Sequence, residues 1–163
     1  MSIHVDIQAA CTEPVPQDQD ICRWVSCTIN TVTDTDEAEV SVRLVAESEM
    51  GELNHQYRGK SGSTNVLSFP ADLPADLQLP LLGDIVVCPA VVIREAQQQH
   101  KTTQQHWAHM LVHGSLHLLG YDHIEDDQAE QMEALEISIL QSLGCPSPYE
   151  QMPEAMADAK VRT

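Results

Sequence analysis

The order of apolar and polar residues predicts strands early in the chain and helices late. Apolar and polar residues alternate over 40–45, a pattern typical of a strand with one buried face. Between 21 and 32 the apolar residues recur at every third or fourth position, which predicts a core-packing helix with Asp18 or Asp20 as its cap. The other predicted strands are 3–7, 64–69 and 84–88.

After Pro89 the pattern changes to helix. The predicted helices are 91–100, 102–119 and 125–143, in addition to a short one over 47–57. Strands followed by helices indicate a single α+β domain, in which a small mixed sheet of about four strands packs with helices. We expect this domain to cover 1–150, whereas the prolines after Cys145 predict a mobile tail at 151–163.

Three histidines near the end of one predicted helix form the candidate site. His113 and His117 are four residues apart, so on a helix their rings lie on one face, about 6 Å apart along the axis. Gly120 permits the left-handed residue that ends a helix, which lets the chain turn back and bring His123 to the same ion. Three neutral nitrogen ligands leave a fourth position open, as catalytic zinc requires. We therefore predict one Zn²⁺ per chain, held by His113, His117 and His123.

The residue that follows His113 bears on which reaction a metal at this site could catalyse. The spacing resembles that of the metzincin zinc site with one deletion. In the related peptidases a Glu follows the first His and serves as general base, but here that residue is Gly114. The sequence therefore favours metal-assisted hydrolysis of something other than a peptide.

Three further histidines precede the predicted ligands. His109 also lies four residues before His113, so a competing pair exists. However, about 12 Å of helix axis separates His109 from His117, which is too far for one ion to take both comfortably. We expect His106 and His109 to support the ligands or to pack in the core, and His100 to lie on the surface.

Charge and cysteine usage narrow the class of protein. The net charge is -17 and only eight Lys and Arg are present, so a polyanion such as RNA would need a local basic cleft, and DNA binding is not expected. No apolar run is long enough to cross a membrane, and the first residues do not resemble a signal peptide. The five cysteines form no C-x-x-C pair, which favours free thiols and a cytoplasmic location.

A second polar segment precedes the predicted strand at 64–69. It reads Asn54-His55-Gln56-Tyr57-Arg58-Gly59-Lys60, followed after two residues by Ser63-Thr64-Asn65-Val66-Leu67-Ser68-Phe69-Pro70. For one arginine a surface salt bridge is the default interpretation of Arg58. The alternative is that its planar fork of donors binds a phosphate or carboxylate.

Taken together, these motifs resemble the YbeY family of bacterial metal-dependent endoribonucleases. The resemblance covers about 38–143. It rests on Leu53-Asn54 with Tyr57-Arg58, on Thr64 to Pro70, on Gly83-Asp84-Ile85 and on H-G-x-L-H-L-x-G-Y-D-H at 113–123. Asn65 stands where many members carry Asp.

The resemblance implies a substrate and a biological role, which composition and residue spacing alone do not indicate. It implies a zinc held by His113, His117 and His123, a catalytic Arg58, and single-strand-specific cleavage of RNA. The expected roles are maturation of the 3′ end of 16S rRNA and ribosome quality control, with the small ribosomal subunit and assembly factors as partners. Apart from the resemblance, no residue obviously replaces the missing general base. Asp122 is one candidate, although such an Asp more often orients a ligand histidine, and the role of Asp84 is open. The attacking oxygen is either a metal-bound water or the 2′-hydroxyl of the RNA.

Two other functions fit the same residues. One is a zinc-dependent hydrolase of small molecules or peptides, which suits the histidine spacing and the acidic charge. The other is a ribosome-assembly factor that binds RNA without cutting it and uses zinc structurally.

Overall fold

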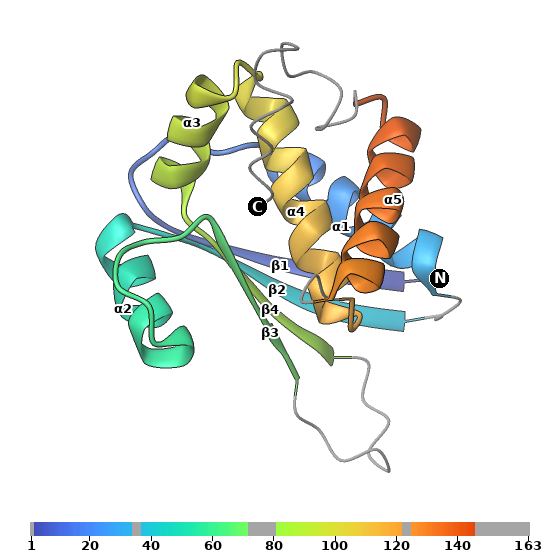
Figure 1. Ribbon diagram of the computed structural model, residues 1–163, viewed down its shortest axis with the longest axis horizontal. Coiled ribbons are helices and arrows are strands. Elements are labelled where there is room, and N and C mark those ends of the chain that lie inside the picture. Colours follow the sequence, from blue (N-terminus) through green and yellow to red (C-terminus); the bar gives the residue numbers. More distant parts are fainter. Residues whose placement is uncertain (1, 34–36, 72–80, 122–124, 146–163) are drawn as a thin grey trace.

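The computed structural model describes residues 2–33, 37–71, 81–121 and 125–145, which form a four-stranded sheet and five helices (Figure 1). The element order confirms the predicted α+β fold. The elements are β1 (Ser2–Ala10), α1 (Asp18–Val32), β2 (Glu37–Val45), α2 (Glu47–Arg58), β3 (Val66–Pro70), β4 (Leu81–Val87), α3 (Pro89–Gln98), α4 (Thr103–Leu118) and α5 (Asp126–Ser142).

The sheet is mixed, as predicted. Its strand order is β1-β2-β4-β3, with β1 parallel to β2 and β2 parallel to β4. Each parallel pair needs a long crossover, which α1 supplies between β1 and β2 and which α2 and β3 supply between β2 and β4. β3 runs antiparallel to β4 and forms one edge of the sheet.

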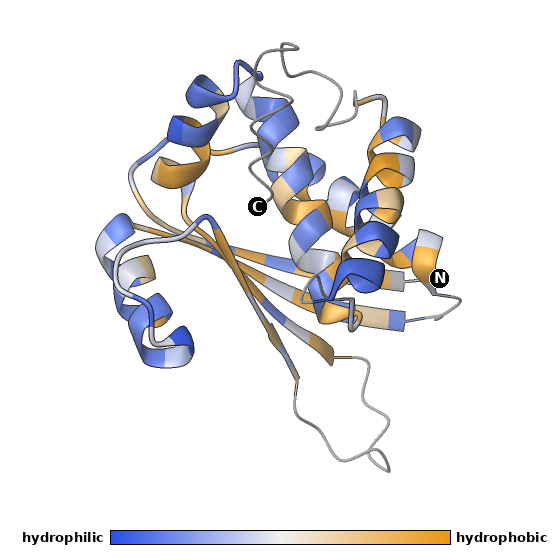
Figure 2. Cartoon of the chain, in the orientation of Figure 1, coloured by the Kyte–Doolittle hydropathy of each residue, from blue (hydrophilic) through white to orange (hydrophobic). Residues whose placement is uncertain are grey.

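Helices cover the two faces of the sheet unequally. On one face α1, α4 and α5 contribute to a large apolar core with alternate residues of the strands. On the other face Met50 of α2 and Val91 of α3 belong to a smaller cluster with Leu67 and Val86. Figure 1 shows α2 on the opposite side of the sheet from α1, α4 and α5, and Figure 2 shows the apolar residues gathered on the strands and the inner sides of the helices.

Helix α4 is the central helix of the molecule. It contacts α1, α3, α5, β3 and β4, and its residues from His106 to Leu116 are all buried. A capping box between Thr102 and Gln105 fixes its start. Its end follows the predicted turn, because Gly120 has a φ of 98° and its N–H donates to the carbonyl of His117 at 3.0 Å.

The predicted cap of α1 is wrong. The N-cap is Gln17, whose side chain makes no capping hydrogen bond, and Asp18 and Asp20 lie in the first turn. There the positive end of the helix dipole favours their charges. Asp20 instead accepts a hydrogen bond from Gln104 in the first turn of α4, at 3.0 Å. The predicted tail at 151–163 lies outside the described residues.

Candidate metal centre

The structure brings His113 and His117 together as the spacing predicts. Their Nε2 atoms are 3.1 Å apart. Two nitrogens bound tetrahedrally to one zinc at about 2.0–2.1 Å would lie roughly 3.3–3.4 Å apart, so the pair is already close to the spacing that one ion needs. His113 is buried and His117 is half-buried, so the site lies where the core meets the surface.

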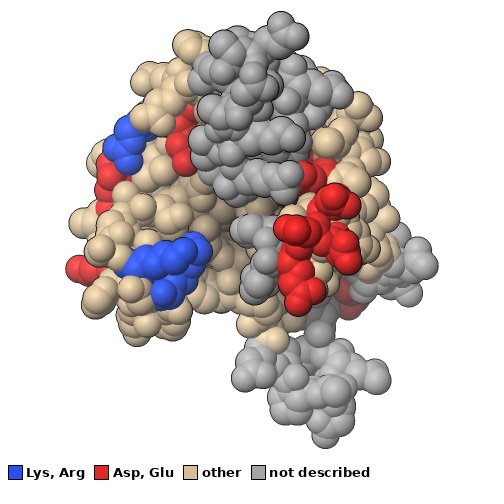
Figure 3. Space-filling view, in the orientation of Figure 1, with Lys and Arg blue, Asp and Glu red and all other residues tan. Residues whose placement is uncertain are grey.

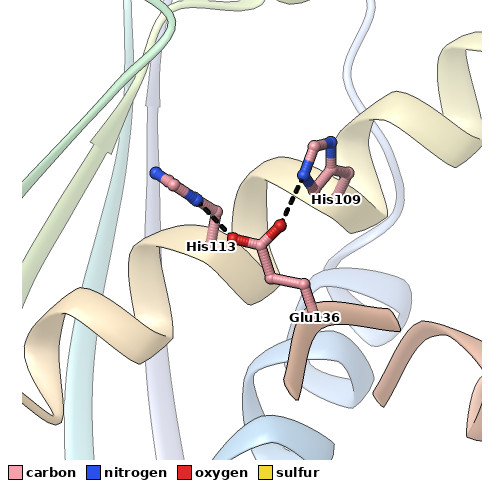
Figure 4. Close-up of side chains that lie close together, drawn as sticks. All are labelled: His109, His113 and Glu136. Atoms are coloured by element: carbon pink, nitrogen blue, oxygen red, sulfur yellow. Dashed lines mark hydrogen bonds and ion pairs between the residues drawn. The ribbon is translucent and has the colours of Figure 1, made fainter. Parts of the chain in front are cut away.

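Glu136 of α5 orients His113 from behind. Its carboxylate, which is 2% exposed, lies 2.7 Å from Nδ1 of His113 and 2.9 Å from Nε2 of His109 (Figure 4). A carboxylate only accepts hydrogen bonds, so His113 carries its proton on Nδ1 and directs the lone pair of Nε2 toward His117. A carboxylate behind a ligand histidine is the usual support of a metal site.

Hydrogen bonds from two imidazoles keep the buried Glu136 ionised. Burial raises the pKa of Glu136, but hydrogen bonds from His109 and His113 outweigh it, and the net pKa lies far below the usual range. For His109, burial lowers the pKa despite the contact with Glu136. The result is a charged carboxylate that accepts from imidazoles deep in the core.

A second assignment of ligands uses the same residues differently. Atoms of His109, His113 and Glu136 lie within 4.8 Å of one another, so this group could hold a metal ion. An ion there would replace the two hydrogen bonds that Glu136 already accepts. The Nε2 atoms of His113 and His117 lie 3.1 Å apart without involving that carboxylate, so the geometry also allows an ion between these two nitrogens. His123, the third predicted ligand, and Asp122 lie outside the described residues.

Gly114, which stands where the peptidases have their glutamate, is closely packed. A Cβ at Gly114 would lie 3.0 Å from Cγ2 of Ile85, 3.2 Å from Cγ2 of Val66 and 3.3 Å from Oγ of Ser68. The hydroxyl of Ser68 also donates to the carbonyl of Gly114 at 2.9 Å. Because α4 rests directly on β3 and β4 at this point, a side chain larger than that of glycine is crowded there.

A second polar cluster lies at the other end of α4. His106 Nε2 is 2.9 Å from Glu95 of α3, and the amide of Asn65 donates to the same carboxylate at 3.1 Å. Burial raises the pKa of Glu95, and the hydrogen bonds from His106 and Asn65 lower it below its usual value. His106 is therefore a buried partner of Glu95. His100 is exposed, as predicted.

Arg58 is the last residue of α2, and its side chain is exposed. No hydrogen bond or ion pair joins its guanidinium to another residue within the described part of the chain, so the default salt bridge is not observed there. Gly59, with a φ of 67°, ends the helix immediately after it. Figure 3 shows Lys and Arg side chains gathered on the α2 side of a hollow, with acidic side chains of α5 across from them.

The loop after Arg58 is held in place. The amide of Asn54 donates to the carbonyl of Gly62 at 2.8 Å, and the hydroxyl of Ser63 donates to Glu47 at 3.1 Å. The loop therefore presents Arg58 and Lys60 from a fixed backbone.

Sequence reasoning missed Glu136 and Glu95. A usable signal existed for Glu136, because it occupies a core position of α5 between Met132 and Ile139, where the helical period predicts an apolar residue. The signal for Glu95 is weaker: it is a single charged residue that lies next to the buried Val92 and Ala96 on α3.

No helix among the described residues is long and apolar enough to cross a membrane. All five cysteines are free.

Comparison with known proteins agrees with this architecture. Residues 7–144 match the family described as Endoribonuclease YbeY. A protein of Pseudomonas fluorescens named Endoribonuclease YbeY is 53% identical over 148 residues, 90% of this chain and 96% of that protein. One of Cellvibrio japonicus with the same name is 51% identical over 156 residues, 94% of this chain and 87% of that protein. The solution structure of TM1509 from Thermotoga maritima aligns with a TM-score of 0.51 and 27% identity, over 86% of this chain and 91% of that one.

Proposed function

Because the chain belongs to the YbeY family of endoribonucleases, we propose that it is a zinc-dependent enzyme that cleaves single-stranded RNA. The proposed roles are maturation of the 3′ end of 16S rRNA and ribosome quality control in the cytoplasm, together with the small ribosomal subunit and assembly factors. One zinc ion per chain would be held by His113, His117 and His123.

One observation carries the metal assignment. The Nε2 atoms of His113 and His117 face each other at 3.1 Å while the buried Glu136 accepts the Nδ1 proton of His113. Two imidazole nitrogens that face each other at this spacing suit zinc, which prefers nitrogen ligands in a tetrahedral arrangement. The partial exposure of His117 gives a substrate access to the same point.

Residues of the chain orient the metal site and bind the phosphate. When bound, zinc supplies Lewis acidity toward the phosphodiester. Glu136 keeps the proton of His113 on Nδ1 and so fixes the orientation of the ring. Arg58 holds a non-bridging phosphate oxygen through its paired donors, because no described residue competes for its guanidinium. Gly114 leaves no carboxylate in the position of the peptidase base, so the proton of the nucleophile is accepted elsewhere.

The test is cleavage of a single-stranded RNA and of the same sequence as a duplex, with zinc-loaded protein and with protein treated with a chelator. The proposal expects cleavage of the single strand alone, and loss of cleavage without zinc. Cleavage that survives complete zinc removal, or equal cleavage of the duplex, would overturn it.

Arg58→Ala tests the catalytic arginine. We expect a loss of cleavage of about 100- to 1000-fold, the usual effect of removing one donor to transition-state charge, and little rescue by Arg58→Lys. Arg23→Ala is the matched control, since Arg23 is an exposed arginine of α1 whose ion pair with Asp20 is 3.9 Å long. Zinc content and the unfolding midpoint are measured first for every variant. Wild-type rates in Arg58→Ala would remove this residue from the mechanism.

A further inference from the structure

Tyr57 presents an aromatic ring to solvent. It is 58% exposed, and it is the one aromatic residue among the exposed large hydrophobic residues in the described chain, the others being Val15 and Leu81. Its ring meets that of Phe69 edge to face, with centroids 5.0 Å apart and an interplanar angle of 68°. In such a contact at least one face of the tyrosine ring stays uncovered. Phe69 therefore steadies the ring and leaves a face free.

The charges around Tyr57 favour an anion more than the net charge of the chain suggests. Of the three acidic residues of α2, Glu47 is paired with Arg94 at 3.4 Å and Glu49 with Arg43 at 2.9 Å, whereas Glu52 in the middle of the helix is exposed. At the other end of the same helix, Arg58 and Lys60 follow Tyr57 and are exposed. An aromatic face beside two cations is the combination with which proteins bind single-stranded nucleic acid.

Strand β3 connects this ring to the candidate metal centre. Phe69 contacts Tyr57, and the preceding residue, Ser68, donates to the carbonyl of Gly114, between His113 and His117 on α4. Successive residues of a strand point to opposite faces of a sheet, and β3 is an edge strand. A flexible polymer that crosses this edge can therefore contact Tyr57 on one side and the metal centre on the other.

We infer that Tyr57 is a stacking platform for an unpaired base of the RNA substrate, with Arg58 and Lys60 contacting the flanking phosphates. This inference rests on the proposed function and adds to it a physical source of single-strand specificity. An unpaired base exposes its π-face to the ring, whereas a base inside a duplex is stacked on both sides and paired.

The test uses the full-length, zinc-loaded protein and a short single-stranded RNA that contains one 2-aminopurine, whose fluorescence falls when it stacks. Tyr57→Phe, Tyr57→Leu and Tyr57→Ala are compared with wild type, and Val15→Ala, at a site 37% exposed, is the matched control. Cleavage gives KM and kcat, and fluorescence of the zinc-free complex reports stacking without catalysis.

We expect Tyr57→Ala to raise KM about 5- to 100-fold, which corresponds to the loss of one base–aromatic stack, with little change in kcat because the contact is made equally in ground and transition states. Tyr57→Phe should keep both affinity and quenching. Tyr57→Leu preserves apolar contact with Phe69 but has no π-face, so it should lose the quenching and resemble Tyr57→Ala.

Two results would overturn the inference in distinguishable ways. If wild type cleaves single-stranded RNA and Tyr57→Ala or Tyr57→Leu binds and quenches as wild type does, stacking on this ring is wrong and the proposed nuclease stands. If wild type neither binds nor cleaves RNA, the proposed function fails and the inference fails with it. Because leucine retains the packing, its comparison with phenylalanine holds even if the alanine variant unfolds.

Discussion

Substitution of Glu136 separates the two ways in which a metal could be held. Its carboxylate accepts hydrogen bonds of 2.7 Å and 2.9 Å from two imidazoles and is 2% exposed. Glu136→Gln keeps one accepting oxygen but places an amide NH2 group, which cannot accept, opposite the second imidazole; a loss of about 1–3 kcal/mol in unfolding free energy is expected. Glu136→Leu leaves two buried N–H groups without an acceptor, and about 3–5 kcal/mol is expected from removing one partner of a buried charged network.

The effect on metal binding is the more informative measurement. If Glu136 supports His113 without touching the ion, Glu136→Gln should weaken zinc binding about 10- to 100-fold, as the loss of such a partner typically does. Competition with a chelator of known affinity measures this, and denaturant unfolding of the zinc-free protein measures the stability change separately. Glu49→Gln is a suitable control, because Glu49 is an acidic residue of α2 on the opposite side of the sheet.

Two results would refute this reasoning. Unchanged zinc affinity together with unchanged stability would mean that the contact with His113 has no energetic role. Complete loss of binding in Glu136→Gln, with full binding in His117→Ala, would make Glu136 a direct ligand and place the ion among His109, His113 and Glu136.

The other predictions concern neighbouring parts of the same helix. His117→Ala should empty the zinc site whereas His109→Ala should retain it, as metal analysis of purified protein will determine. Gly114→Ala should destabilise the fold by up to about 2 kcal/mol, because crowding of roughly 1–3 kcal/mol against stiff β-branched side chains exceeds the helix-propensity gain of about 1 kcal/mol; an unchanged unfolding midpoint would contradict it. Glu95→Gln should cost about 1–2 kcal/mol near neutral pH. Since the folded pKa of Glu95 is lowered, the stability it contributes is fully present above the ordinary value of 4.5 and is lost as pH falls through the folded pKa. Urea unfolding measured across this pH range should therefore show the unfolding free energies of wild type and Glu95→Gln converging in acid. A difference that stays constant with pH would contradict this prediction.

Local rules predicted the elements well because each leaves a signal within a few residues. The histidine pair at positions 113 and 117 follows from the helical period alone, and the turn at Gly120 follows from the need for a positive φ. These inferences depend on geometry within one helix. The sequence therefore predicts that these two histidines lie side by side on one face of the helix.

Contacts between helices were not predictable in the same way. Glu136 is 23 residues from His113, and although its place among the apolar positions of α5 marks it as facing the core, nothing within that helix indicates which imidazoles its carboxylate contacts. Asn65 meets Glu95 across 30 residues. A carboxylate in place of Asn65 would bring two negative charges together, so this amide is matched to its partner in a way that only the folded chain reveals.

The central place of α4 has a consequence for synthesis of the chain. Trp107, Leu111 and Leu116 of this helix belong to the main core, yet they follow all four strands in sequence. A nascent chain that ends before Leu118 can form the strands and α1 but has no central helix to cover their apolar face. Domains fold as units during translation, so α4 must have emerged from the ribosome before this core can close. Until then the uncovered sheet is exposed to chaperones and to aggregation.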